Sequence, residues 1–356
     1  MHARGMTTAR LSFILVASMA AIPGLAEPQS SSAAEQGRTV PARQIPVPTT
    51  VSPQLAKIVS APPVPPIAPQ TAQEWKAAVQ SASEQEAERI AAALTQFAVT
   101  IEPLQIAGVP CFAVNPPKVS ARNAHRVLLH LHGGAYVFGP GRAGTLEAIL
   151  VAGTSGMRVI SVDYRMPPDH PFPAAMDDSV AVWKALTHRQ NPSNMAVFGT
   201  STGGAMTLAL VQAAQKQHLP LPAAIASGTP WSDLTNTGDS YFTNEGIDNA
   251  LVSYEPVLGA AARLYAGSVD LKDPRVSPVY GSFHGFPPTL LTTGTRDLFL
   301  SNTVRVHRKL REAGVDSRLE VYEAQSHAQY LVDPTSPESK EALRDIASFF
   351  NAHLGT

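Results

Sequence analysis

Short apolar segments alternate with helix-length segments from about residue 100 to the C-terminus. The expected strands cover residues 127–131, 158–162, 195–198, 223–227, 289–293 and 318–322, and the expected helices cover 145–152, 174–186, 205–217, 302–313 and a last segment ending near His353. Buried strands that alternate with helices predict an α/β fold, in which helices cover both faces of a mainly parallel sheet. Ligands bind beyond the carboxyl ends of the strands in such sheets, so we expect the functional site there.

The composition excludes several classes of protein. Hydrophobic residues make up 44% of the 356 residues and charged residues 15%, against about 25% charged in an average globular chain. Lys and Arg number 27 against 28 Asp and Glu, a net charge of -1, so no strong field attracts nucleic acid or an anionic membrane. The single Cys111 excludes an intramolecular disulfide and a Cys-rich zinc site.

Residues 1–26 resemble an export signal. Arg4 and Arg10 precede a short apolar run over 11–21, and small residues near Ala26 suit a signal peptidase. The run is shorter than the roughly 20 apolar residues that span a bilayer. We therefore expect cleavage near Ala26 and a secreted or periplasmic protein without a stable membrane anchor. The alternative is an N-terminal helix packed on the core.

Residues 27–70 contain a cluster of prolines. Proline fixes φ and removes a backbone donor, so this segment is expected to form a linker or an extended surface arm. Thr71 can cap a helix that begins near Ala72, with Glu74 as its capping-box partner. One or two helices are expected over 71–100.

The strand expected at 195–198 leads directly into Gly199-Thr-Ser-Thr-Gly203, and a helix follows. A G-x-S-x-G turn between a strand and a helix holds its serine strained and exposed. Ser201 is therefore the candidate nucleophile. The similar run Gly153-Thr-Ser-Gly156 lacks the full spacing and the preceding strand, so we assign it no role.

A serine hydroxyl needs a base, and the base needs an acid that orients it. Asp297 follows the strand at 289–293 and His327 follows the last strand, at the sheet edge where Ser201 is expected. The order Ser, Asp, His is that of α/β hydrolases. A purely structural role for His327 remains the alternative.

The first of these strands ends at His132-Gly-Gly-Ala135. Acyl transfer places negative charge on an oxygen, which preorganised backbone N–H groups can bind. Gly133, Gly134 and Thr202 are the candidate oxyanion-hole residues, with Ala135 as a further donor. His130 and His132 share a strand face but have no third ligand at a suitable spacing. We expect no metal and no cofactor.

Taken together, these motifs resemble the hormone-sensitive-lipase-like branch of the α/β hydrolases, the bacterial esterases with a His-Gly-Gly-Gly motif. The likeness covers about residues 125–353 and includes the segments 163–165, 170–174, 177–178, 230–234 and 273–278. The resemblance implies a catalytic domain at 101–234 and 269–356. It also implies a helical cap, built from 71–100 and an insertion at 235–268.

Three departures from the family pattern bear on the site. Ala135 replaces the third glycine, which leaves the hole intact if φ is negative there. Thr202 replaces a smaller residue and is expected to narrow the acyl pocket. After Asp297, Leu298-Phe299 replaces the family's Pro-Leu, which leaves the fine geometry of the acid loop open.

The expected cap insertion is rich in large apolar side chains, namely Tyr241, Phe242, Tyr254, Leu258 and Tyr265. Such a lid suits an apolar acyl or alcohol group. The alternative is that these side chains pack the lid onto the body of the protein.

The resulting hypothesis is a serine carboxylesterase that hydrolyses short to medium acyl-chain esters through an acyl-enzyme on Ser201. One alternative keeps the same groups and changes the substrate to lactones, carbamates or carbohydrate acetyl esters. Another is a ligand-binding homologue without catalysis. The expected partner is a small-molecule ester and not a nucleic acid, and the sequence does not decide between a monomer and a homodimer.

Overall fold

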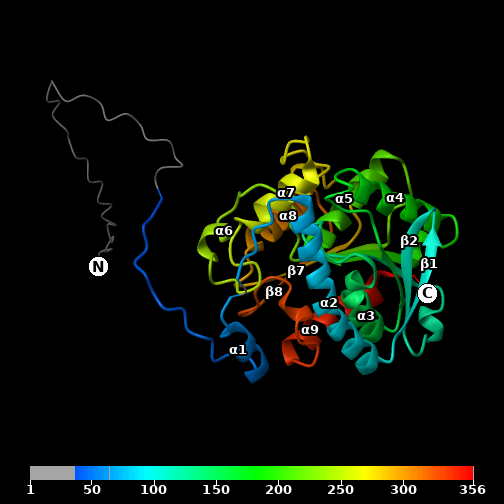
Figure 1. The fold of residues 1–356 in the computed structure, drawn as a ribbon. Coiled ribbons are helices and arrows are strands. Elements are labelled where there is room, and N and C mark those ends of the chain that lie inside the picture. Colours follow the sequence, from blue (N-terminus) through cyan, green and yellow to red (C-terminus); the bar gives the residue numbers. More distant parts are fainter. Residues whose placement is uncertain (1–36, 64, 356) are drawn as a thin grey trace, which may run out of the picture. The chain divides into compact units, whose positions relative to one another are not determined.

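The computed structural model describes residues 37–63 and 65–355 (Figure 1). The predicted signal peptide at 1–26 lies outside these residues. Residues 1–44 and 45–356 are separate units, and the elements below all belong to the second. Within the described part of the chain, no helix combines the length and the apolar character needed to cross a membrane.

The described residues of this unit form a sheet of eight strands in the order β1-β2-β4-β3-β5-β6-β7-β8. β2 is antiparallel to both of its neighbours, and the other neighbouring strands are parallel. The strands are β1 (Thr100–Ile106), β2 (Val109–Asn115), β3 (Val127–Leu131), β4 (Arg158–Val162), β5 (Met195–Thr200), β6 (Ala224–Gly228), β7 (Thr289–Gly294) and β8 (Ser317–Tyr322). The predicted α/β fold with a mainly parallel sheet is confirmed.

The hairpin of β1 and β2 was not predicted. Ala107 and Gly108 form its two-residue turn, with φ of 51° and 81°. Positive φ at both positions suits the tight turn that joins twisted antiparallel strands. Two strand-like runs on either side of Ala-Gly were the signal that the sequence offered.

The helices cover both faces of the sheet (Figure 1). They are α1 (Pro53–Val59), α2 (Ala72–Phe97), α3 (Leu146–Ser155), α4 (Ala174–Thr187), α5 (Thr202–Lys216), α6 (Ser240–Thr243), α7 (Val257–Ala266), α8 (Leu300–Glu312) and α9 (Pro337–His353). Neighbouring strand residues point to opposite faces. Leu128 therefore packs in the cluster with α3 and α9, and Leu129 packs in the cluster with α4, α5 and α8.

The described part of the proline-rich segment contains the helix α1, which was not predicted. Ser52 caps this helix, Pro53 starts it, and Leu55 and Val59 are buried. The Ser52 hydroxyl also donates to the Glu338 carboxylate at 2.7 Å. Proline at the first helical position fits a helix start, so the cap and two buried side chains fix this helix.

α2 is one helix of 26 residues, and it begins as predicted. Thr71 and Glu74 form the expected capping box. Trp75 and Ile90 are buried in the two different clusters, so α2 contributes to packing along much of its length.

The turn from β5 into α5 passes very close to the end of β3. A Cβ atom built on Gly203 would lie 1.9 Å from the Leu131 carbonyl oxygen, and one built on Gly199 would lie 2.1 Å from the same atom. No side chain fits at these distances. The two glycines thus bring the start of α5 against the loop that follows β3.

We predict that Gly203→Ala lowers the free energy of unfolding by about 3 kcal/mol, because the backbone must shift to admit the methyl group. Alanine favours helices over glycine, so propensity alone predicts the opposite sign. Ala213→Gly in the same helix is the matched control, with an expected loss of about 1 kcal/mol. Urea unfolding measures both, and a Gly203→Ala protein as stable as the wild type would contradict the prediction.

Candidate active site

Ser201 occupies the turn between β5 and α5 with a strained backbone. Its φ is 64° and its ψ is -123°, a region that non-glycine residues rarely adopt and that costs on the order of 1–3 kcal/mol. The Ser201 N–H donates to the Gly228 carbonyl at 2.8 Å, and the Trp231 N–H donates to the Ser201 carbonyl at 3.0 Å. These two hydrogen bonds therefore hold Ser201 in the strained conformation that the G-x-S-x-G pattern predicted.

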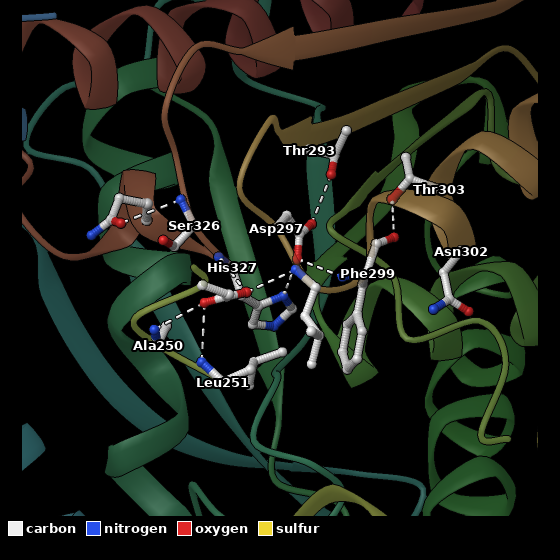
Figure 2. A network of polar contacts seen from close by, with 12 residues as sticks. Ala250, Leu251, Thr293, Asp297, Phe299, Asn302, Thr303, Ser326 and His327 are labelled. Atoms are coloured by element: carbon white, nitrogen blue, oxygen red, sulfur yellow. Dashed lines mark hydrogen bonds and ion pairs between the residues drawn. The ribbon is translucent and has the colours of Figure 1, made fainter. Parts of the chain in front are cut away.

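Asp297 and His327 lie beyond the ends of β7 and β8 and contact each other (Figure 2). Asp297 Oδ1 is 3.0 Å from His327 Nδ1. The same oxygen accepts the Phe299 N–H at 2.9 Å, and Oδ2 accepts the Thr293 hydroxyl at 2.7 Å. Asp297 is fully buried and His327 is 6% exposed. A carboxylate at Nδ1 keeps a proton on that nitrogen and leaves Nε2 of the neutral ring as the acceptor.

Ser201 and His327 line one cavity of about 430 Å³. Nε2 of His327 is buried and has no hydrogen-bond partner among the described residues, the Ser201 hydroxyl included. Hydrogen bonds between catalytic groups are often long before substrate binds. A larger hollow of about 820 Å³ lies elsewhere, beside α4 and α5, and contains none of these three groups.

The loop after β3 forms another wall of this cavity. Gly133, Gly134 and Ala135 line it, and their N–H groups donate to no described acceptor. A Cβ atom on Gly133 would lie 2.8 Å from the Thr200 carbonyl oxygen, so only glycine allows this approach. Thr202 is the first residue of α5, where the N–H has no acceptor within the helix.

Ala135 and Thr202, two departures from the family pattern, are both located by the structure. The φ of Ala135 is 53°, so the condition of a negative φ is not met; the Gly134 carbonyl accepts the N–H groups of both Val137 and Phe138 in a tight turn. The Ala135 N–H is retained in this conformation. The Thr202 side chain is fully buried and is not among the residues that line the cavity, so it does not narrow the pocket.

His132 supports the loop as a neutral ring. Burial lowers the pKa of His132 to about 3. Its Nδ1 lies 2.7 Å from the Gly133 carbonyl oxygen, and its ring stacks on Tyr164 with 4.1 Å between centroids. His130 instead contacts Glu147 and Ser161 at 3.1 and 2.9 Å. Among the described residues, no group of three His, Cys, Asp or Glu side chains is placed to hold a metal ion.

The tyrosines of the 235–268 segment pack against the body of the protein. Tyr241, Tyr254 and Tyr265 are buried in the main cluster, and Tyr265 stacks on Tyr136 at 3.6 Å between centroids. Phe242 is 64% exposed. Of the five residues considered as a lid, Leu258 alone lines the cavity among the described residues. The three tyrosines instead pack this segment onto the body of the protein, which was the alternative interpretation.

A polar network at Thr200, next to Ser201, and a buried acid at the His327 N–H were not predicted. The Thr200 hydroxyl donates to Glu147 at 2.6 Å and also contacts the Tyr330 hydroxyl. Asp248, between α6 and α7, is fully buried and accepts the N–H of His327 at 3.2 Å. Thr200 lies in the Gly199–Gly203 motif, but Glu147, Tyr330 and Asp248 lie in none. Both features depend on contacts between distant segments.

Comparison with known proteins shows the family of this chain. The α/β-hydrolase-fold family matches residues 128–331. An esterase of Acinetobacter venetianus is 31% identical over 255 residues, which cover 70% of this chain and 82% of that protein.

Solved structures of esterases are also similar. The crystal structure of an esterase named E25 has 44% identity and a TM-score of 0.87, covering 90% of this chain and 100% of that one. An esterase of the bacterial hormone-sensitive lipase family has 29% identity and a TM-score of 0.69, covering 81% and 100%. The chain therefore belongs to the α/β-hydrolase family, among the esterases of the hormone-sensitive-lipase type.

Proposed function

We propose that this serine carboxylesterase hydrolyses short to medium acyl-chain esters through an acyl-enzyme on Ser201. The observation that supports it most is the Asp297–His327 pair, which shares a cavity with a serine on a strained turn. Gly133, Gly134 and Ala135, whose N–H groups have no acceptor in the described part of the chain, line the same cavity. The non-catalytic alternative loses its support, because esterases are among the similar proteins.

In the proposed reaction, Ser201 Oγ attacks the ester carbonyl while His327 Nε2 takes its proton. The N–H groups of Gly133, Gly134 and Thr202 bind the oxyanion. His327 then returns the proton to the leaving alcohol, and Asp297 stabilises the imidazolium. Water activated by His327 attacks the acyl-enzyme and releases the acid, which restores Ser201.

We propose that the two predicted cap segments, 71–100 and 235–268, take part in substrate binding. Ala82 and Ser83 of α2, together with Leu251 and Leu258 of the 235–268 segment, line the cavity near Ser201. These mostly small and apolar side chains suit an acyl or alcohol group of modest size. An acetyl-hydrolase of Streptomyces hygroscopicus is 29% identical over 236 residues, which keeps acetyl esters within the proposed substrate class.

We further propose that residues 1–26 direct export and that the mature protein is secreted or periplasmic. This rests on the apolar run at 11–21 and on the small residues before the expected cleavage at Ala26.

Ser201→Ala and His327→Ala are each expected to lower kcat for p-nitrophenyl butyrate about 10⁶-fold, and Asp297→Asn about 10⁴-fold. Ser155→Ala is the matched control, because Ser155 belongs to the Gly-Thr-Ser-Gly run without a predicted role; its kcat should stay within about twofold. EDTA should leave the activity of the wild type unchanged. Wild-type rates in purified Ser201→Ala would refute the mechanism.

Acyl length should decide the rate, because a cavity of about 430 Å³ lies toward the lower end of the range of ligand sites. We expect kcat/KM for p-nitrophenyl butyrate to exceed that for the myristate ester at least 10-fold. A series of p-nitrophenyl esters and a simple lactone measures this. Rates that rise up to the myristate ester would contradict the proposed substrate range, and faster turnover of the lactone would favour the alternative.

Export is tested by expression of the full chain in a Gram-negative host, followed by fractionation and N-terminal sequencing. We expect a periplasmic or secreted protein that begins near Glu27. Leu15→Arg places a charge in the apolar run, so this variant should stay uncleaved in the cytoplasm. An uncleaved wild type in the cytoplasm would contradict the proposal.

A further inference from the structure

One loop of the 235–268 segment contacts the chain at both Asp297 and His327. The Asn244 side-chain amide donates to the Asp297 carbonyl oxygen at 2.9 Å. Asp248 Oδ2 accepts the N–H of Leu298 at 2.8 Å and the N–H of His327 at 3.2 Å. A single carboxylate oxygen thus joins the main chain that follows the acid to the main chain of the base.

The other oxygen of Asp248 fixes the carboxylate in its own loop. Oδ1 accepts the N–H groups of Ala250 and Leu251 at 2.9 and 3.1 Å (these two residues appear in Figure 2). Asp248 is fully buried, and no Lys or Arg among the described residues forms an ion pair with it. Four N–H donors therefore replace the water that a buried carboxylate loses.

The contact with Leu298 requires an N–H at that position. Proline, which the resemblance implies after the acid, has no N–H to donate. Leu298 is fully buried, so its backbone N–H needs an acceptor within the protein. The Leu300 N–H donates to the Asp297 carbonyl at 3.1 Å, so Leu298 is the second residue of a turn, where proline is also accepted.

The charge of Asp248 also acts on the pair. Asp297 and His327 are the titratable groups of the neighbouring loops that shift the pKa of Asp248. Burial and the negative charge of Asp297 raise this pKa, whereas the positive charge of His327 lowers it. The interaction with His327 is reciprocal, since a negative Asp248 favours the positive imidazolium. That cation forms when the serine loses its proton.

We propose that Asp248 is a positioning residue of the esterase: it holds the Asp297 and His327 loops in register through the Leu298 and His327 amides, and its charge supports the imidazolium. This rests on the roles proposed above for Ser201, Asp297 and His327. The residue belongs to the predicted cap insertion, so the cap segment contributes to the alignment of the catalytic pair as well as to the cavity wall.

Asp248→Asn tests the proposal with little change of shape. Each oxygen of the Asp248 carboxylate accepts two N–H groups. The asparagine replaces one oxygen by an NH₂ group, which cannot accept them, so at least two of the four hydrogen bonds are lost. We expect kcat for p-nitrophenyl butyrate to fall about 10- to 100-fold, as for small misplacements of catalytic groups, with KM within about twofold. The acidic limb of the kcat/KM profile should move to lower pH by about half a unit, because a negative charge near the imidazolium is absent.

Asp233→Asn is the matched control. Asp233 is also a fully buried carboxylate, but it pairs with Arg305 at 2.6 Å and accepts the Tyr280 hydroxyl at 2.8 Å, away from His327. This variant should lose stability without a change in the pH profile. Equal kcat and equal pH profiles for the two variants would overturn the proposal and leave Asp248 a structural role alone.

Leu298→Pro and Leu298→Ala test the same contact from the other side and serve if Asp248→Asn does not fold. Both shorten the buried side chain, but only Leu298→Pro removes the N–H. We expect kcat to fall about 10-fold further in Leu298→Pro than in Leu298→Ala, and equal values would overturn the proposal. Failure of the proposed mechanism itself would appear separately, as activity retained in Ser201→Ala.

Discussion

The close approach of α5 to the end of β3 is the constraint on which the site depends. Gly203 allows the first turn of α5 to lie against the Leu131 carbonyl, where any Cβ atom would collide. That approach sets the strained turn at Ser201 beside the loop of Gly133 and Gly134. The nucleophile and the candidate oxyanion donors thus owe their proximity to backbone packing, which also fixes the sheet around them.

The acid and the base are positioned by backbone packing and by polar contacts. Asp297 and His327 belong to two loops after neighbouring strands. Backbone hydrogen bonds join the two loops directly, since the Arg296 N–H donates to the Gln325 carbonyl at 3.1 Å. A Cβ atom on Gly294 would lie 2.0 Å from the Gln325 carbonyl oxygen, so close backbone packing acts here as well. Polar contacts add to it: the Thr293 hydroxyl and the Phe299 N–H hold the Asp297 carboxylate, and Asp248 accepts N–H groups from both loops.

Much of this arrangement could be predicted from the sequence, because parallel strands bring their carboxyl ends to one edge. The segments 127–131 and 158–162 coincide with β3 and β4, and the turn at Ser201 lies where the motif predicted. Local signals also sufficed for the capping box at Thr71. These features depend on short stretches of chain, which the sequence displays directly.

The features that escaped prediction depend on contacts between distant segments. The positive φ of Ala135 follows from a turn that its neighbours impose, and Thr202 points into the interior instead of the pocket. Asp248 has no motif; its importance appears only when residues 248, 298 and 327 are seen together. Leu298 adds a backbone N–H next to the acid, but its sequence position does not show that Asp248 accepts this N–H.

A crystal structure of the enzyme inhibited by an alkyl phosphonate, which mimics the tetrahedral intermediate, tests the proposed assembly of the site. We expect phosphorus bonded to Ser201 Oγ and a phosphonyl oxygen about 3 Å from the N–H groups of Gly133, Gly134 and Thr202. His327 Nε2 should lie at hydrogen-bond distance from the bound group. An adduct on another residue, or an imidazole turned away from Ser201, would contradict this assembly.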